Sequence, residues 1–230
     1  MAAETGLAAL VGRRACAFGT EHAVRPRALL RVGGLVHMRF ALAVAAGAGG
    51  GLGIAYSDET PPDITDFTNT LLNRVAERGF GHLDVVLEPG RSLVGNAGVL
   101  LTTVEYLKPG AEKNFCIVDA AMTELMRPAL YEAHHGIVPA QAKQTKSLKY
   151  DVVGPVCESG DWLGKDRQLA VDEGDLLAIL SAGAYGFVMA SNYNTRPKPA
   201  EIMVDGKNAY VIRARENTQN LFASESILPK

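Results

Sequence analysis

Cysteine is scarce in this sequence. Only Cys16, Cys116 and Cys157 occur in 230 residues, and no two of them form a CxxC pair. This number and spacing favour neither a disulfide framework nor a zinc site, and they fit a reducing compartment best. Long uncharged apolar runs are also missing, because stretches such as residues 41–46 are too short to span a bilayer. We therefore expect a cytoplasmic protein with no metal site and no membrane partner.

The sequence has no strong excess of charge of either sign. Its formal net charge is -2 and its pI is about 6.2. Such a balance gives no electrostatic reason to expect nucleic acid as a partner, so a small polar substrate is the better expectation. With 47% hydrophobic and 21% charged residues, the chain is long enough to bury a core in one large domain or two small ones.

The amino-terminal region differs from the rest in composition. Residues 1–45 are rich in arginine, alanine and glycine, and they contain no lysine. They resemble a transit peptide only superficially, and the Arg13-Arg14 pair is followed by a broken apolar stretch, unlike an export signal. We interpret residues 1–45 as an atypical, poorly ordered leader.

Residues 46–96 show an α/β pattern. The apolar run at 41–46 predicts a strand that ends in a cluster of glycines, and Asp63 is a plausible N-cap for an amphipathic helix that ends at Gly79. A second apolar run at 83–87 predicts a strand that ends directly in Glu88-Pro89-Gly90-Arg91. Strand, helix and strand in this order predict parallel pairing with a right-handed crossover, as in α/β barrels.

Residues 97–230 show a different pattern of short β segments. These are predicted at 99–106, 114–119, 150–156, 175–180 and 185–190, followed by a hairpin of 201–204 and 209–213 around Asp205-Gly206. The pattern predicts an antiparallel β barrel or sandwich. The fold class is therefore α/β plus all-β.

Two segments of the α/β part are candidates for binding an anionic group. Glycines such as Gly50 and Gly51 could let backbone N–H groups approach a phosphate, although taken alone they are more often a flexible turn. In the segment Glu88 to Arg91, the guanidinium could bind a phosphate or carboxylate, and the glutamate could keep a heteroaromatic nitrogen protonated. A surface turn with an ion pair is the alternative.

Candidates in the β part are weaker when each is taken alone. Cys157 and Glu158 follow a β segment, where a protonated thiol could donate a proton and a carboxylate could bind a cation, but a buried structural cysteine is the commoner case. Arg127 and Tyr131 are four residues apart, so one helical turn would place them on one face. Tyr185 would ordinarily be a core tyrosine, and the histidines are assigned no role.

Taken in order, several segments give a more specific signal. They are GGGLGI, EPGR, MRPALY, CESGD, GAYG and YNTRPKPAE, spread over residues 48–227. Together they resemble the bacterial diaminopimelate decarboxylases, of the fold-type III enzymes that depend on pyridoxal 5'-phosphate. This resemblance implies an amino-terminal (β/α)8 barrel, of which residues 46–96 would be a remnant, and a carboxyl-terminal β domain at 97–230. It also implies a homodimer that converts meso-2,6-diaminopimelate to L-lysine.

The resemblance further implies roles for individual residues. The cofactor would be bound by Gly50, Gly51, Glu88, Pro89, Gly90, Arg91 and Tyr185. The substrate, diaminopimelate, would be bound by Arg91, Arg127, Tyr131, Glu158 and Tyr185. Cys157 would be the catalytic proton donor, acting from the partner subunit.

One departure from the family concerns lysine. The family uses a lysine near the start of the barrel to form a Schiff base with the cofactor, and this sequence has no lysine before Lys108. We therefore expect a truncated chain that needs a complementing amino-terminal half. The alternatives are a non-catalytic relative that dimerises with a full-length decarboxylase and regulates it, and a free-standing catalyst that uses another lysine.

Overall fold

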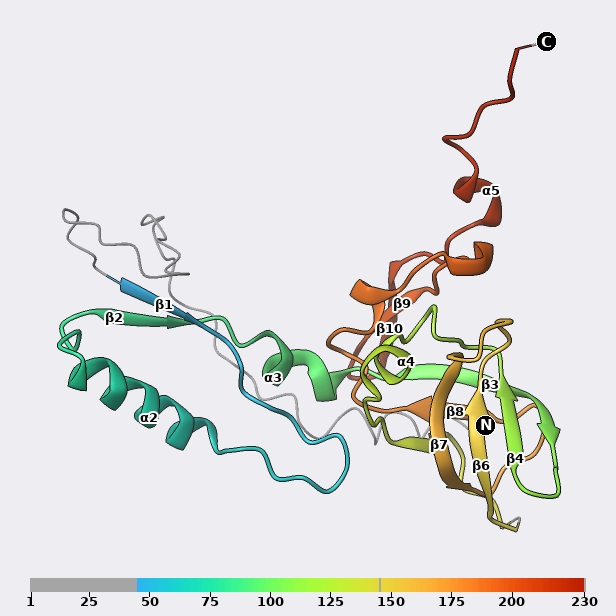
Figure 1. Cartoon of the computed structure of the whole chain (residues 1–230), viewed down its shortest axis with the longest axis horizontal. Coiled ribbons are helices and arrows are strands. Elements are labelled where there is room, and N and C mark those ends of the chain that lie inside the picture. The colour runs from blue at the N-terminus through green and yellow to red at the C-terminus, as the bar shows by residue number, and fades with distance from the viewer. Residues whose placement is uncertain (1–44, 145, 230) are drawn as a thin grey trace. The chain divides into compact units, whose positions relative to one another are not determined.

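The computed structural model describes residues 45–144 and 146–229, in two compact units (Figure 1). The first unit covers residues 45–94 and the second covers residues 95–229. The predicted leader at 1–45 lies almost wholly outside the described residues. Within the described part, none of the helices combines the length and the apolarity that a membrane crossing needs.

The first unit is a strand, helix and strand followed by a short helix. Strand β1 (Ala45–Gly49) pairs in parallel with β2 (Asp84–Leu87), and α2 (Ile64–Glu77) lies between them in sequence. The Asp63 carboxylate caps α2 by accepting the Thr65 N–H at 2.7 Å, which satisfies one of the free donors of the first turn. The predicted helix, its cap and the parallel pairing are confirmed. The glycine cluster begins inside β1 rather than after it.

The apolar face of α2 is not covered within this unit. None of the residues of α2 is buried, and Phe67, Leu71 and Val75 on its apolar stripe are only half-buried. A helix with such a stripe needs another layer to pack against. Among residues 50–94, Ile54 is the one buried hydrophobic residue, so this part of the unit has little core of its own.

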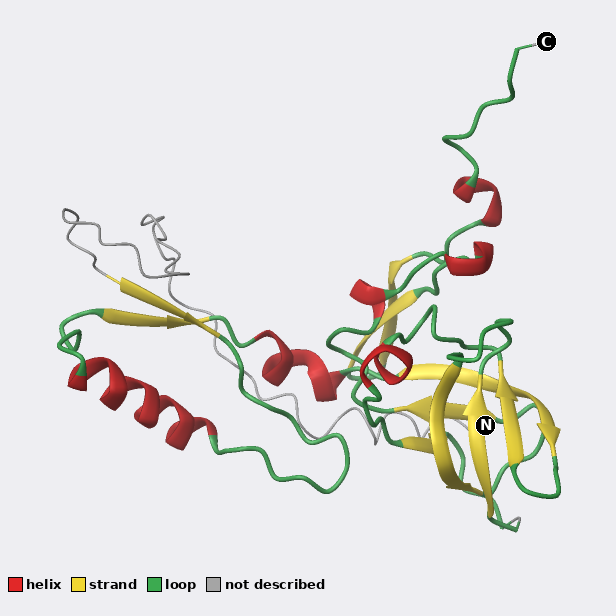
Figure 2. Cartoon of the chain, in the orientation of Figure 1, coloured by secondary structure: helices red, strands yellow, loops and turns green. Residues whose placement is uncertain are grey.

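The second unit is built on a six-stranded sheet (Figure 2). Its strands are β3 (Leu100–Lys108), β4 (Asn114–Val118), β5 (Ile137–Pro139), β6 (Leu148–Val153), β7 (Trp162–Leu169) and β8 (Leu176–Ile179). They lie in the order β5-β8-β3-β4-β6-β7, and the two end strands contact each other, so the sheet curls into a nearly closed barrel. The predicted β domain is confirmed, but its sheet is mixed rather than antiparallel, because β4 and β6 pair in parallel.

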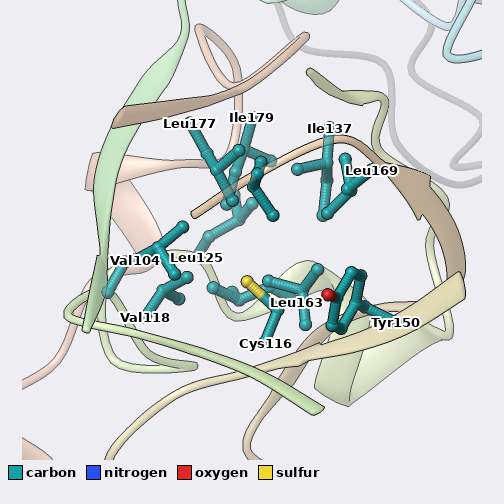
Figure 3. Packing of buried hydrophobic residues seen from close by; sticks show 13 residues of the cluster. Val104, Cys116, Val118, Leu125, Ile137, Tyr150, Leu163, Leu169, Leu177 and Ile179 are labelled. Atoms are coloured by element: carbon teal, nitrogen blue, oxygen red, sulfur yellow. The ribbon is translucent and has the colours of Figure 1, made fainter. Parts of the chain in front are cut away.

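Side chains from the inner faces of these strands form the core (Figure 3). The labelled members include Val104, Cys116, Tyr150 and Leu163, which point toward one another inside the barrel. In β3 and β4 the buried positions are two residues apart, as expected when alternate side chains face inward. This buried cluster fixes the strands from which the functional loops leave.

Short helices and a hairpin complete the second unit. They are η1 (Gly95–Ala97), α4 (Arg127–Tyr131), η2 (Phe187–Met189), η3 (Tyr193–Thr195) and α5 (Thr218–Leu221), with the hairpin of β9 (Glu201–Asp205) and β10 (Asn208–Arg213). The hairpin turns at Gly206, whose φ is +60°, so the prediction from Asp205-Gly206 is confirmed.

One strand prediction was wrong, and two strands, the short β5 (Ile137–Pro139) and β7 (Trp162–Leu169), were not predicted. Residues 185–190 are not a strand, because Tyr185 has a φ of 58° and the chain turns directly into η2. Strand β7 was missed, because its residues Lys165, Asp166 and Arg167 interrupt any apolar alternation. Pairing with β6 holds β7 in place, with Asp166 at a φ of 56° where the register of the two strands shifts.

Candidate functional site

The ends of β1 and β2 bring the glycine cluster and the EPGR segment together. A Cβ atom at Gly50 would lie 2.6 Å from the Glu88 carbonyl oxygen, so only glycine permits this approach. Gly51 has a φ of +102°, which also favours glycine, and the space beside its Cα is open. The proximity of these two segments, predicted from their positions at neighbouring strand ends, is thereby observed.

The EPGR segment starts the short helix α3 (Gly90–Val94). The Gly90 N–H donates to the Glu88 carbonyl at 2.9 Å, and the Ser92 hydroxyl donates to the Pro89 carbonyl at 3.3 Å, so the segment is a tight turn. The Glu88 side chain is exposed and Arg91 is half-buried. Both charged groups are accessible to an anionic or heteroaromatic ligand.

In the second unit, Cys157 and Glu158 lie on the loop between β6 and β7. Both side chains are exposed. Cys116, in contrast, is fully buried in β4, and this burial raises the pKa of its thiol to about 12. The exposed thiol of Cys157 can therefore meet a ligand, whereas Cys116 is part of the core.

The Cys157 loop is held from inside by Asp161. Its buried carboxylate accepts the backbone N–H groups of Val156 and Met122, each at 2.7 Å. Burial raises the pKa of the Asp161 carboxyl, against the opposing effect of these two donors. The second bond joins the loop to the segment that leads into α4.

Glu158 has a partner from another part of the unit. The Tyr193 hydroxyl donates to its carboxylate at 3.4 Å, and Tyr193 belongs to η3 (Tyr193–Thr195). Tyr193 was assigned no role from the sequence, and only its place in the YNTRPKPAE segment could have drawn attention to it.

Arg127 begins α4, and its guanidinium is held by a buried histidine. Pro128 follows in the first turn and is buried. Proline is favoured in the first turn because an N–H there would have no partner within the helix. The Arg127 Nη1 group donates to His135 Nε2 at 3.1 Å. Tyr131, one turn later, is 63% exposed. His135 was given no role from the sequence, because a histidine beside a strand carries no distinguishing pattern.

Tyr185 lies in a tight turn after β8. Its side chain is 49% exposed, so it is not the core tyrosine that its surroundings would ordinarily suggest. A left-handed backbone is uncommon for an aromatic residue, and residues held in such conformations occur often at functional sites. The segment therefore presents the phenol ring to solvent or to a ligand.

Arg196 ties the segment before α4 to the carboxyl-terminal region. Its guanidinium donates to the Asp119 carbonyl at 2.7 Å and to the Thr123 hydroxyl at 3.1 Å, and it lies 3.4 Å from the Glu124 carboxylate. Glu124 and Thr123 are buried. The residues before Arg127 are thus fixed by Asp161 on one side and by Arg196 on the other.

The described residues offer no group of three or more His, Cys, Asp or Glu side chains able to hold a metal ion. The functional groups that they offer are instead a thiol, carboxylates, guanidiniums and phenols. These groups suit an amino-acid substrate with charged ends and a reaction that moves protons.

The second unit is thus a nearly closed β-barrel domain whose loops present a thiol, carboxylates, guanidiniums and phenols. Residues 20–183 match the family model described as "Pyridoxal-dependent decarboxylase, C-terminal sheet domain". The chain belongs to this family of pyridoxal-dependent decarboxylases, and the family's cofactor is the one expected from the sequence.

Two similar curated proteins are both diaminopimelate decarboxylases. The chain is 53% identical to the diaminopimelate decarboxylase of Vibrio cholerae over 182 residues, which are 79% of this chain and 43% of that protein. It is 54% identical to that of Pseudomonas aeruginosa over the same length and the same shares. The resemblance to diaminopimelate decarboxylases is thereby confirmed.

Solved structures agree with the sequence comparison. The crystal structure of diaminopimelate decarboxylase from M. jannaschii has a TM-score of 0.76 and 38% identity, covering 80% of this chain and 43% of that one. The Helicobacter pylori enzyme complexed with L-lysine has a TM-score of 0.71 and 41% identity, covering 77% and 43%. The chain spans less than half the length of these relatives.

Proposed function

We propose that this chain is the carboxyl-terminal part of an enzyme that decarboxylates meso-2,6-diaminopimelate to L-lysine with pyridoxal 5'-phosphate. The observation that carries the proposal is the exposed Cys157-Glu158 loop on a sheet domain about half identical to diaminopimelate decarboxylases. Solved relatives bind L-lysine, the product of this reaction.

We assign residues 46–96 to the cofactor-binding (β/α)8 barrel and residues 97–230 to the β domain. The support for a barrel origin is the parallel β1–β2 pair and the uncovered apolar face of α2, which neighbouring barrel elements would cover. The leader assigned to 1–45 remains a prediction, as does a place in the cytoplasm. A homodimer, or a complementing amino-terminal half, is the proposed partner.

The residues present in the first unit fit pyridoxal phosphate. Gly51 leaves open space beside its backbone, and Gly50 lets the two strand ends meet, so the phosphate can approach main-chain N–H groups. Pro89 and Gly90 shape the turn that presents Glu88 to a pyridine nitrogen and Arg91 to a phosphate or a substrate carboxylate. When bound, the cofactor supplies an electron sink for the bond that breaks.

Residues of the second unit bind and orient the substrate. The Arg127 guanidinium receives a substrate carboxylate, with the Tyr131 hydroxyl one helical turn away. The Glu158 carboxylate, in contact with Tyr193, binds a substrate ammonium group. The Tyr185 ring, which is half exposed, contacts both cofactor and substrate.

Cys157 moves the proton that completes the reaction. Its Sγ–H delivers a proton to the carbon that the carboxylate has left. The exposure of Cys157 is necessary for this role. In the proposed dimer it acts on the partner subunit's substrate.

Complementation tests the proposal. Residues 1–107 contain no lysine, so the chain is mixed with the separately expressed amino-terminal part of the Vibrio cholerae relative, which contributes the cofactor-bonding lysine. With pyridoxal phosphate and meso-diaminopimelate, the mixture is expected to release L-lysine and carbon dioxide. Cys157→Ala should lower kcat at least about 100-fold, whereas Cys116→Ala, which removes the buried thiol, should keep most of kcat.

The outcomes separate the competing functions. A stable, cofactor-loaded complex of the two parts that forms no lysine would contradict the proposal. Association with an intact decarboxylase that changes its rate, without activity in the mixture, would indicate a regulatory relative instead. A chain that forms lysine by itself would indicate a catalyst using a different lysine.

A further inference from the structure

His135 joins two segments that carry proposed substrate residues. It lies between α4 and β5, and its side chain is 0% exposed. On one side, its Nε2 atom is 3.1 Å from Arg127 Nη1. On the other side, its Nδ1 atom is 2.9 Å from the Leu180 carbonyl oxygen, just beyond β8 (Leu176–Ile179).

These two contacts determine the form of the imidazole. A carbonyl oxygen can only accept, so Nδ1 carries the proton, and a guanidinium can only donate, so Nε2 is the acceptor. Both contacts are satisfied only by the neutral ring with its proton on Nδ1. A protonated ring would place an N–H toward the Arg127 N–H and break that contact.

The position of the ring is itself fixed by the fold. The Leu180 N–H donates to the Gly136 carbonyl at 2.8 Å, so the peptide groups on both sides of the ring are bonded to each other. The chain then runs through Ser181, whose hydroxyl accepts from the Asn96 amide at 2.8 Å, to Tyr185. His135 therefore sits between the Arg127 helix and the Tyr185 segment.

The surroundings of the ring are cationic. Burial is the largest cause that lowers the pKa of His135, and the positive charges of Arg127 and Arg167 and the neighbouring His134 act in the same direction, against the Leu180 carbonyl. Arg167 in turn donates to His134 Nε2. A neutral imidazole at this point accepts from the Arg127 guanidinium without adding a negative charge beside it.

We propose that His135 is a positioning residue, which orients the Arg127 guanidinium to receive the carboxylate of the substrate. The inference rests on the proposed function, because it assumes that Arg127 binds substrate. The guanidinium carries five N–H donors in one plane, so fixing Nη1 also sets the direction of the other donors. An acidic side chain in place of His135 would pair with the Arg127 charge, whereas the neutral imidazole orients the guanidinium and adds no charge that competes with the substrate carboxylate.

The two amide variants of His135 separate its two contacts. In His135→Gln the longer side chain reaches the Nε2 position and can still accept from Arg127. In His135→Asn the amide lies near the Nδ1 position, so it can donate to Leu180 but no longer reaches Arg127. In the complemented enzyme, His135→Asn should raise KM for meso-diaminopimelate about tenfold or more, with kcat changed less than about threefold. His135→Gln should change KM by less than about threefold.

A double-mutant cycle with Arg127→Met tests whether His135 acts through Arg127. The expected result is that His135→Asn has almost no further effect on KM once Arg127 is replaced. Equal effects of His135→Asn in both backgrounds would overturn the inference. If the unsubstituted mixture forms no lysine, the proposed function fails first, so the two failures are distinguishable.

An NMR measurement on the unsubstituted chain keeps the inference testable if a variant does not fold. Nitrogen-15 spectra of the histidine rings at neutral pH should show His135 protonated at Nδ1 and unprotonated at Nε2. A ring protonated at Nε2, whether neutral or charged, could not accept from Arg127 and would overturn the inference. The Arg127 Nη signals should also shift in His135→Asn and return toward the original position in His135→Gln.

Discussion

The Asp161 carboxylate accepts the backbone N–H of Met122 at 2.7 Å, across 39 positions of the sequence. Its other oxygen accepts the Val156 N–H, also at 2.7 Å. One side chain therefore joins the loop of Cys157 and Glu158 to the segment that leads to Arg127. The relative placement of the proposed proton donor and of the substrate arginine depends on this carboxylate.

Replacing Asp161 with asparagine should destabilise the second unit. The amide has one oxygen for two N–H donors, and its NH2 group would face a donor, which leaves a buried group unsatisfied. We expect a loss of about 1–3 kcal/mol in the free energy of unfolding, measured by urea denaturation. Asp205→Asn in the exposed β9–β10 hairpin is the matched control and should change it by less than about 0.5 kcal/mol. Equal effects of the two changes would show that the Asp161 bonds contribute nothing.

Gly154→Ala should displace the same carboxylate. A Cβ atom at Gly154 would lie 2.4 Å from Asp161 Oδ2 and 2.8 Å from the Ala120 carbonyl oxygen. We expect a destabilisation of about 1–3 kcal/mol, as for overpacking in a core, and a faster hydrogen exchange of the Met122 and Val156 amides. Gly160→Ala in the same loop should be tolerated, because its Cβ would meet only the flexible Glu158 side chain, with Cγ at 3.8 Å and Oε1 at 3.9 Å. Unchanged exchange in Gly154→Ala would contradict this account.

The two described cysteines should differ in reactivity. In a Cys16→Ser background, iodoacetamide should modify exposed Cys157 at least about tenfold faster than Cys116, whose thiol is buried with a pKa of about 12. Peptide mass spectrometry after timed quenching measures both rates, and urea-unfolded protein is the control in which the rates should converge. Comparable native rates would mean that the β4 core opens readily.

His135 should make the stability of the second unit depend on pH. Burial lowers the pKa of His135 below its usual value near 6.5, so the unfolded chain binds the proton more tightly than the folded one. The stabilisation is therefore present above about pH 6.5 and is lost as the pH falls, with a limiting slope of about 1.4 kcal/mol per pH unit. Urea denaturation between pH 5 and 7.5 measures it. His135→Gln should remove this part of the slope, and an unchanged slope would show that His135 titrates normally.

Much of the first unit follows from local sequence. Asp63, the apolar spacing from Ile64 onward and Gly79 define α2 through capping and helical periodicity, which act within one or two turns. The parallel pairing of β1 and β2 follows because a helix lies between them. In the same way Asp205-Gly206 defined the β9–β10 hairpin.

Other features depend on contacts between distant residues. Strand β7 contains Lys165 and Asp166, and only its pairing with β6 keeps it extended. Residues 185–190 have a suitable composition for a strand, but the backbone of Tyr185 turns the chain away. The parallel pairing of β4 with β6 was likewise invisible, because strand order depends on how the whole sheet closes.

The features of the candidate site fall into the same two groups, those set by local sequence and those set by distant contacts. By itself the sequence determined the family, through Glu88 to Arg91, Cys157 to Asp161 and Gly183 to Gly186. Each of these motifs is a run of consecutive residues, and their order along the chain can be recognised without a structure. Only the tertiary structure decided that Cys157 is exposed while Cys116 is buried, that Asp161 holds the loop, and that His135 meets Arg127. Burial and hydrogen bonding depend on residues far away in the sequence, so the local hydrophobic pattern does not predict them.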